Sequence, residues 1–299
     1  MSKEKLRLGF NGKFEEKDVE IAVDDPAPWD PSFKFSLLGT RVARLDGPAK
    51  ATGAARYSID VRLPGMLYGK FLRSPHPAAL VKSLDLSAAR RMPGVKATLA
   101  IVKPGEAVRF AGQEVAAVAA DTPERALDAI GAIGITYETR PFVVDPAAAR
   151  KPESPLVFEQ KVETKTSAGD LPSAAKPLGR KGNVQGPRAF SKGDVEQGFR
   201  QADAVVEGTY TTQVQTHTAL ETHGVVARWE GDELTVWAST QGIFSVRDEL
   251  AEVLGLSKSK VNVVTEYMGG GFGAKFGART EGVTAAKLAK EAGAPVKLF

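Results

Sequence analysis

The sequence predicts an α+β fold, because short apolar strands alternate with short helices along most of the chain. The clearest unit begins with Glu114–Ala120, a near-continuous Val/Ala run that is typical of a buried strand. A helix over Glu124–Ile133 and a strand over Ile135–Glu138 follow it. A comparable order returns later, where the strand Glu233–Ala238 precedes an amphipathic helix over Ser245–Leu254.

Composition divides the chain into four predicted segments, in keeping with the two domains that a length of 299 residues favours. Residues 1–36 are predicted to be an irregular leader with a short strand at Leu6–Phe10. Residues 37–147 form a first α+β domain. Residues 148–190, rich in Lys, Pro, Ser and Gly, are predicted to be a linker, and residues 191–299 begin a second domain.

In the first domain, a turn at Pro64–Gly65 precedes a strand over Met66–Leu72. Further along, a strand, a short helix and another strand follow one another, with Ser87 as the expected N-cap of the helix. The next helix can be capped by Asp121 or Thr122. Its predicted buried face carries Ala126, Ile130 and Ile133.

The second domain is predicted to begin with a helix over Lys192–Ala202, whose Val195 and Phe199 side chains point inward. Three strand-like runs follow, at Ala204–Thr212, Gly224–Trp229 and Glu233–Ala238. The later amphipathic helix is expected to bury Val246, Leu250, Val253 and Leu254. A strand over Val261–Glu266 then leads into a glycine-rich loop, and a helix extends through Glu281–Ala292.

Composition also excludes several kinds of site. The chain has no cysteine, so it can hold neither an iron–sulfur cluster nor a thiolate zinc site nor a disulfide. A three-histidine zinc site would need His76, His217 and His223 together, from two distant segments. The net charge is +4 and the positive residues are scattered, which is typical of a solvated surface and not of a nucleic-acid interface. We find neither a signal peptide nor a membrane span of about 20 apolar residues, and expect a cytoplasmic protein.

The sharpest motif is the glycine cluster Gly269–Gly273, which surrounds Phe272 between a predicted strand and a predicted helix. Glycines permit positive φ and a close approach of a ligand to the backbone, and free N–H groups ahead of a helix favour anions. The spacing to Lys275 does not fit a Walker A loop, and no βαβ unit supports a dinucleotide fingerprint. The cluster is therefore a candidate cradle for an anion or an organic cofactor, with a tight packing turn as the alternative.

A second motif places three ionisable side chains, those of His217, Glu221 and His223, within seven residues. In a strand their even spacing would put all three on one face. They can form a polar cluster near a cofactor, or a buried hydrogen-bonded set that fixes a strand end. The residues alone favour the structural alternative.

The third motif, Ser239–Gly242, lies at the end of one predicted strand and just before a helix. Polar side chains at such a junction can point into a cleft above the strand ends. A neutral amide such as that of Gln241 can donate a hydrogen bond to a metal-oxo group without adding charge. The alternative is capping of the helix by the Ser or Thr side chain.

Taken in order and with their gaps, the three motifs resemble those of the molybdenum-cofactor-binding subunits of the xanthine dehydrogenase/aldehyde oxidase family. The first half agrees, because GTRVARLDGPAKATGAARYSIDVRLPGMLYGKFLRSPHPAAL and GQEVAAVAADTPERALDAIGAIGITYE resemble the two parts of that family's a/b hammerhead domain. The resemblance covers about residues 37–299. It implies a hammerhead domain followed by the first part of a molybdopterin-binding α/β domain.

The resemblance also implies a chemistry and a set of partners. In this family a molybdenum ion, held by a pterin dithiolene, oxidises an aldehyde or N-heterocycle with water-derived oxygen, and a glutamate acts as the base. Electrons leave through iron–sulfur clusters to FAD or another acceptor. Those centres lie in separate subunits or domains, which suits a chain without cysteine.

Carried over by position, Gln241 and Phe272 are expected beside the molybdenum, as its neighbours and not as its ligands. The predicted cofactor contacts are Gln241, Gly242, Gly270, Gly271, Phe272 and Gly273. Phe276 falls where purine-oxidising members carry a substrate-binding glutamate. Because Phe276 offers no hydrogen bond to a purine edge, an aldehyde or a less polar heterocycle is favoured over xanthine.

One departure from the family concerns length. The family's glutamate base and most of its pterin contacts lie several hundred residues further on, and no segment here matches them. We therefore expect no catalytic residue in this chain, and expect it to be inactive until a C-terminal half of the subunit completes it. The alternatives are a docking module built on the hammerhead domain, a decayed fragment, or a nucleotide-binding protein that uses the glycine loop.

Overall fold

The computed structural model describes residues 2–10, 13–21, 29–158, 180–185 and 192–299, so most of the predicted linker lies outside the described residues. The chain divides into two compact units, residues 1–56 with 170–175 and residues 57–169 with 176–299. In the first unit, β1 (Ser2–Phe10) and β2 (Lys13–Ile21) form an antiparallel hairpin, and helix α1 spans Gly47–Ala51. The hairpin is longer than the predicted short strand and adds a second strand to it.

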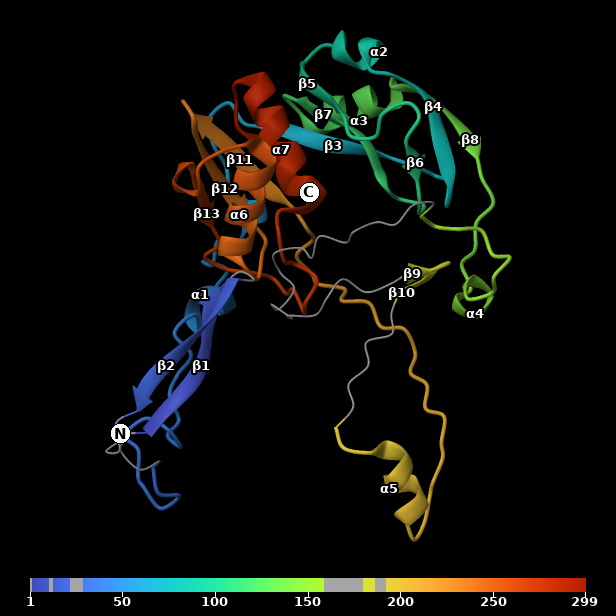
Figure 1. The fold of residues 1–299 in the computed structure, drawn as a ribbon. Coiled ribbons are helices and arrows are strands. Elements are labelled where there is room, and N and C mark those ends of the chain that lie inside the picture. The colour runs from blue at the N-terminus through green and yellow to red at the C-terminus, as the bar shows by residue number, and fades with distance from the viewer. Residues whose placement is uncertain (1, 11–12, 22–28, 159–179, 186–191) are drawn as a thin grey trace. The chain divides into compact units, whose positions relative to one another are not determined.

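The second unit contains a seven-stranded mixed sheet with the order β13-β12-β11-β14-β3-β7-β5 (Figure 1). Its strands are β3 (Leu67–Arg73), β5 (Val95–Ala100), β7 (Glu114–Ala120), β11 (Val225–Glu230), β12 (Glu233–Ala238), β13 (Val261–Val264) and β14 (Val296–Leu298). A three-stranded sheet consists of β6 (Ala107–Val108), β4 (Ala79–Asp85) and β8 (Gly134–Thr139), in that order. A further short pair comprises β9 (Arg180–Lys181) and β10 (Val184–Gln185).

Six α-helices of the second unit are described, together with two single 3₁₀ turns at Ser58–Asp60 and Lys258–Lys260. The helices are α2 (Ser87–Arg90), α3 (Pro123–Gly131), α4 (Pro146–Ala149), α5 (Val195–Gln201), α6 (Ile243–Leu254) and α7 (Arg279–Ala292). Thr122 caps α3 as predicted, because its side chain accepts the Arg125 N–H. The predicted Ser87 cap is wrong by one residue. Leu86 is the N-cap of α2, and the Ser87 N–H donates to the Asp85 carboxylate.

Strand β7 lies at the centre of the core because both of its faces are covered. Ala117 and Ala119 pack in the cluster that contains α7, whereas Ala116 and Val118 pack with Ala129 of α3. The buried face of α7 is also formed by small side chains, including those of Ala285, Ala286 and Ala289. Small residues on both sides let helix and strand approach closely, so the predicted buried strand is confirmed.

Strand β14 joins the two halves of the seven-stranded sheet. It pairs in parallel with β3, where Val296 lies opposite Leu67, and antiparallel with β11, where Leu298 lies opposite Val225. Gly69 makes room for this contact, since a Cβ there would lie 2.8 Å from Leu298 Cδ1. Strands from both halves of the sequence therefore belong to one sheet.

The elements predicted from β11 onward are confirmed with small differences at their ends, but three expectations nearby need correction. The strand predicted at Ala204–Thr212 is absent. Val195 and Phe199 of α5 do not point inward; their side chains are 51% and 58% exposed. In α6 the third buried residue is Ala251, whereas Val253 is exposed, because position 253 lies at the edge of the packed face.

Candidate functional site

Three segments that are far apart in the sequence meet beyond the C-terminal end of β12. They are Glu221–His223, Ser239–Gly242 and the loop Gly269–Lys275. The Glu221 N–H donates to Gly269 O at 3.2 Å, and the Gln241 N–H donates to Lys275 O at 2.8 Å. The three motifs singled out in the sequence therefore form one site.

The Gln241 side chain is held by its oxygen. Oε1 accepts the Gly273 N–H at 2.9 Å and the Lys275 N–H at 3.3 Å. Both partners are donors, so the amide presents its oxygen to them, and its NH₂ group has no acceptor among the residues that the structure describes. Gln241 is exposed. The site therefore offers a fixed, neutral hydrogen-bond donor.

Close approaches and backbone conformation explain the glycines of the loop. A Cβ on Gly271 would lie 2.5 Å from Gln241 Cδ, and a Cβ on Gly269 would lie 2.5 Å from Glu221 Cβ. Gly270 and Gly273 have φ values of 101° and 92°, which other residues rarely adopt. The glycine pattern is thus needed to bring the loop against Glu221 and the Gln241 amide.

Phe272 lies at the tip of the loop in a strained conformation. Its φ is 50° and its side chain is 70% exposed. Within the described part of the chain, the N–H groups of Gly270, Gly271 and Phe272 donate to no acceptor. Three consecutive free donors beside an exposed ring suit an organic group that carries anionic or carbonyl oxygens.

A buried ionic cluster underlies the loop. The Lys275 ammonium donates to Glu221 O at 2.6 Å and to Ser239 Oγ at 2.7 Å, and lies 3.9 Å from the Glu221 carboxylate. Ser239 Oγ and the Gly269 N–H both donate to that carboxylate, at 2.9 and 2.8 Å. Burial lowers the pKa of Lys275, and the charge of Glu221 opposes that shift. The cluster ties all three motifs together.

Lys275 and Ser239 lie within the named motifs, but neither is among the cofactor contacts predicted from the sequence. A lysine beside glycines usually indicates an exposed cation, and a serine before a helix usually indicates a cap. The single signal in the sequence is Glu221, the one acidic residue between Glu207 and Glu230, which needs a cation when buried.

The two histidines of the second motif have different surroundings. His223 Nε2 lies 3.2 Å from Ala274 O, so it can donate to the loop backbone. His217 is exposed, and its Nε2 lies 4.0 Å from a Cβ built on Gly273. The predicted common face of a strand is wrong because no strand forms here and Thr218 has a φ of 43°.

Phe276 and Gly242 lie together at the start of α6. A Cβ built on Gly242 would lie 3.4 Å from Phe276 Cδ1, and Phe276 is half-buried. The Gly242 N–H donates to Thr240 Oγ1 at 3.1 Å, and that hydroxyl donates to Lys275 O at 3.0 Å. The structure thus places both predicted residues at the site, with the Phe276 ring packed against the backbone that carries Gln241.

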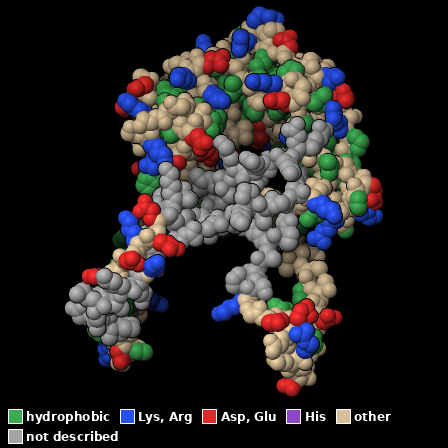
Figure 2. Space-filling model, in the orientation of Figure 1, with side chains coloured by type: hydrophobic (Ala, Val, Ile, Leu, Met, Phe, Trp, Pro, Cys, Tyr) green, Lys and Arg blue, Asp and Glu red, His purple; other side chains and the backbone are tan. Residues whose placement is uncertain are grey.

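The surface, the ionisable side chains and the helices add three observations. On the face drawn in Figure 2, acidic and basic side chains are interspersed and no large area carries one sign of charge. Among the described residues, no group of three His, Asp or Glu side chains could hold a metal ion, and no helix is long and apolar enough to cross a membrane.

Two stretches of the chain match known protein families. Residues 52–106 match the a/b hammerhead domain of aldehyde oxidase and xanthine dehydrogenase, and residues 178–299 match the molybdopterin cofactor-binding domain. The chain belongs to the xanthine dehydrogenase/aldehyde oxidase family. The predicted α+β fold, with a hammerhead domain followed by a molybdopterin-binding region, is confirmed.

Members of the xanthine dehydrogenase/aldehyde oxidase family are similar to this chain over most of its length. It is 35% identical over 273 residues to a probable xanthine dehydrogenase subunit of Bacillus subtilis, a match that covers 85% of the chain and 34% of the relative. It is 33% identical to the nicotinate dehydrogenase large molybdopterin subunit of Eubacterium barkeri, covering 81% of the chain and 56% of the relative. The crystal structure of Cu,Mo-CO dehydrogenase superimposes with a TM-score of 0.72 and 32% identity, covering 87% of the chain and 35% of that structure. The chain therefore spans about a third to about half of the length of these family members.

Proposed function

We propose that this chain forms one wall of the molybdopterin site of a molybdenum hydroxylase, and that the remainder of the subunit completes the site. The observation that carries the proposal is the Gln241 amide. Its oxygen is held by the N–H groups of Gly273 and Lys275, which leaves its NH₂ group as a fixed donor on an exposed face. Such a donor can stabilise a polarised oxygen without adding charge to the site.

The other residues of the loop fit one side of such a cofactor. The free N–H groups of Gly270, Gly271 and Phe272 can donate to its phosphate and carbonyl oxygens. The exposed Phe272 ring provides an apolar wall that excludes water. The Gly242 N–H donates to Thr240 Oγ1, on the other side of Gln241 in the sequence. When bound, the cofactor supplies a molybdenum centre that oxidises the substrate with oxygen derived from water.

We further propose that the general base, most of the pterin contacts and the electron-transfer partners lie outside this chain. A glutamate base in the remainder of the subunit would take the proton, and iron–sulfur and FAD subunits would accept the electrons. The matched relatives support this division, because they are named as subunits and extend well beyond the region that this chain covers.

For the substrate we propose an aldehyde or an N-heterocycle of low polarity. Phe276 has no hydrogen-bonding group, and its ring packs on Gly242 beside the Gln241 backbone. A pocket that reads a purine edge needs polar side chains there, and an apolar ring discriminates against such a substrate.

The substitution Gln241→Glu tests the donor role. The carboxylate keeps an oxygen for the two loop N–H groups but has no N–H of its own. In the complex of the full chain with the remainder of the subunit, we expect molybdenum and pterin content to fall about tenfold, the loss of one hydrogen bond to a charged group. The melting temperature of the chain alone should change little.

Gln113→Glu is the matched control. The Gln113 Oε1 also accepts a backbone N–H, that of Arg109 at 2.8 Å, but the pair lies outside the glycine loop. This variant should retain full molybdenum content. Unchanged content in Gln241→Glu would contradict the donor role, and a wild-type complex that contains no molybdenum would contradict the proposed function.

A further inference from the structure

Residues 203–220 have the composition of a β-strand, but no neighbouring strand pairs with them among the described residues. Among the described residues, their backbone N–H and C=O groups make no backbone–backbone hydrogen bond, and Figure 1 draws the segment as a plain trace after α5. Threonine and valine are its commonest residues, and both favour β-strands. Backbone groups of this kind usually pair in a folded domain.

The side chains of this segment alternate as they do in a half-buried strand. One set, which we name the apolar face, consists of Val206, Gly208, Tyr210, Thr212 and Val214. The opposite set begins with Val205 and is polar from there on, with Glu207, Thr209, Thr211, Gln213 and Gln215. Val206, Tyr210 and Val214 are 91%, 91% and 94% exposed. Gly208 leaves space for the Tyr210 ring, because a Cβ there would lie 2.9 Å from the tyrosine oxygen.

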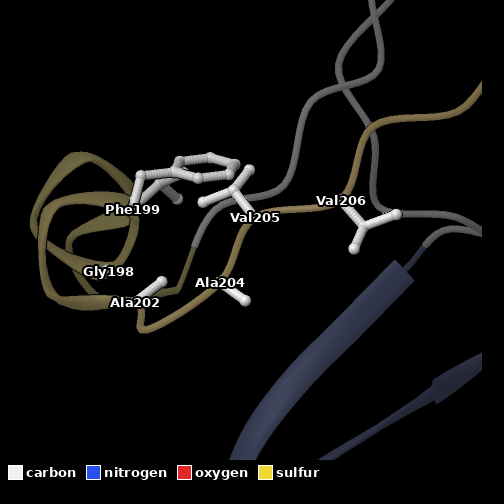
Figure 3. Close-up of a pocket in the computed structure, with 7 residues that line it drawn as sticks. Gly198, Phe199, Ala202, Ala204, Val205 and Val206 are labelled. Carbon is white, nitrogen blue, oxygen red and sulfur yellow. The ribbon is translucent and has the colours of Figure 1, made fainter.

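The uncovered apolar surface continues onto helix α5. Val195 and Phe199 of this helix line a shallow pocket together with Val205 and Val206 (Figure 3). The sequence places these two helix residues at the spacing of a buried helix face, yet both are more than half exposed. A contiguous apolar surface of this kind marks a contact with another polypeptide.

We propose that Ala204–Thr216 is an edge strand that pairs with a strand of the remainder of the molybdenum subunit, which also covers the apolar face and α5. The inference rests on the proposed function. The segment lies within the region that matches the molybdopterin cofactor-binding domain, and the relatives that share this region extend far beyond the part covered here. The partner strand needs free N–H and C=O groups and an apolar layer beside them.

This pairing would also set the geometry of the site. The segment runs directly into Glu221, whose backbone and carboxylate hold Gly269 and whose carbonyl accepts from Lys275. A strand fixed by the remainder of the subunit would therefore fix one attachment of the glycine loop. Assembly of the chain with the remainder of the subunit would therefore also complete the cofactor wall.

The test uses the complex that the full chain forms with the remainder of its own subunit, purified after the two are co-expressed. Tyr210→Asp places a charge on the apolar face and should weaken the complex about tenfold or more. Thr211→Asp, one residue further and on the polar face, should change the dissociation constant less than about threefold. Both positions are exposed, so neither variant should alter the melting temperature of the chain alone.

Amide hydrogen exchange supplies the second measurement. We expect the amides of residues 204–216 to exchange freely in the chain alone and alternate amides to become protected in the complex. Absence of a complex, equal effects of the two aspartate variants, or a self-associating chain whose dimer is weakened by Tyr210→Asp would overturn the proposal. Protected amides in a complex without molybdenum would support the strand pairing and refute the proposed function. A complex that contains molybdenum but leaves these amides unprotected would support the proposed function and refute the strand pairing.

Discussion

At Lys275, a full charge occupies a position whose side chain has no exposed surface. Its hydrogen-bond partners, Glu221 O and Ser239 Oγ, come from the other two motifs of the site. One oxygen of Glu221 is itself buried without a hydrogen-bond partner among the described residues, and there the Lys275 ammonium, 3.9 Å from the other oxygen, is the one cation that balances the carboxylate.

Replacing Lys275 by Met should therefore lower the free energy of unfolding by about 3 kcal/mol, because the Glu221 charge loses its cation. Urea unfolding measures the effect. Lys287→Met, at an exposed position of α7, is the control and should stay within about 0.5 kcal/mol of the parent chain. Adding Glu221→Gln to Lys275→Met should recover part of the loss. Equal effects of the two lysine variants would show that the cluster contributes nothing.

Glu281, in the first turn of α7, gives a prediction about pH. Burial raises the pKa of Glu281 above its ordinary value of 4.5, against the lowering effects of its own N–H group and of nearby His223. The folded chain thus keeps a proton that the unfolded chain has lost, so this residue's contribution to stability rises as pH falls toward 4.5. We expect Glu281→Gln to be more stable than the parent at pH about 7.5 and to lose that advantage at pH about 5.

The control for this comparison is Glu153→Gln, at an exposed loop position. Its stability difference from the parent chain should be the same at both pH values. If the difference between Glu281→Gln and the parent does not narrow on acidification, the assignment of a buried carboxyl at this position is wrong.

At this scale the sequence predicts which motifs matter but not how they are held. The residues of HTALETH, STQG and MGGGFGAK could be named because their types suit a polar or anionic ligand. The contact of Lys275 with Glu221 could not be predicted, because the two residues are 54 positions apart and meet only in the folded interior. Nor could the orientation of the Gln241 amide, which depends on where two loop N–H groups lie.

Among the elements, β7 is buried on both faces, which leaves little room for larger side chains. Ala119 is fully buried in the cluster that contains α7. We expect Ala119→Leu to lower the free energy of unfolding by about 1–3 kcal/mol, because a larger side chain forces the helix and the strand apart. Ala100→Leu, an exposed position on the neighbouring strand β5, is the matched control. A loss no larger than that of the control would mean that α7 does not pack closely on β7.

Elements whose partners are local or whose pattern is strong could be predicted, and β7 and β12 match their expected bounds. The strand expected at Ala204–Thr212 shows the limit of such reasoning. Its residue types do favour a strand, but a strand also needs a hydrogen-bonded neighbour, and none is found among the described residues. The same cause explains the exposed Val195 and Phe199, whose periodicity indicates a buried face without saying what buries it.

For the second unit as a whole, the continuous sheet predicts cooperative opening. Since β14 pairs with both β3 and β11, the strands of the hammerhead half should not open independently of those near the site. Native-state hydrogen exchange in increasing urea should give the same opening free energy for amides of β7 and of β12. The β1–β2 hairpin, which belongs to the other unit, should open at a lower free energy. Two distinct values for β7 and β12 would contradict this continuity.

The order of strands at this scale could not be predicted. The run at residues 296–298 has three buried positions and offers no sign of the strands it will join. Its neighbours β3 and β11 are distant in the sequence. Nothing in the residue patterns of the three strands indicates that β14 pairs with these two strands and not with others. Composition and motifs predict domains in series, whereas backbone pairing merges their strands into one sheet.

The position of β14 between β3 and β11 has a consequence for synthesis on the ribosome. The residue opposite Leu67 is Val296, so the inner edge of β3 lacks its neighbour while more than 200 residues are still to be made. At about 5–20 residues per second, that interval lasts on the order of 10–50 s. During this time an apolar strand edge is open to wrong pairing. We therefore expect chaperones to bind the nascent chain during this interval. We also expect inclusion bodies when translation is faster than chaperone binding, because β14 pairs with β3 so late in synthesis.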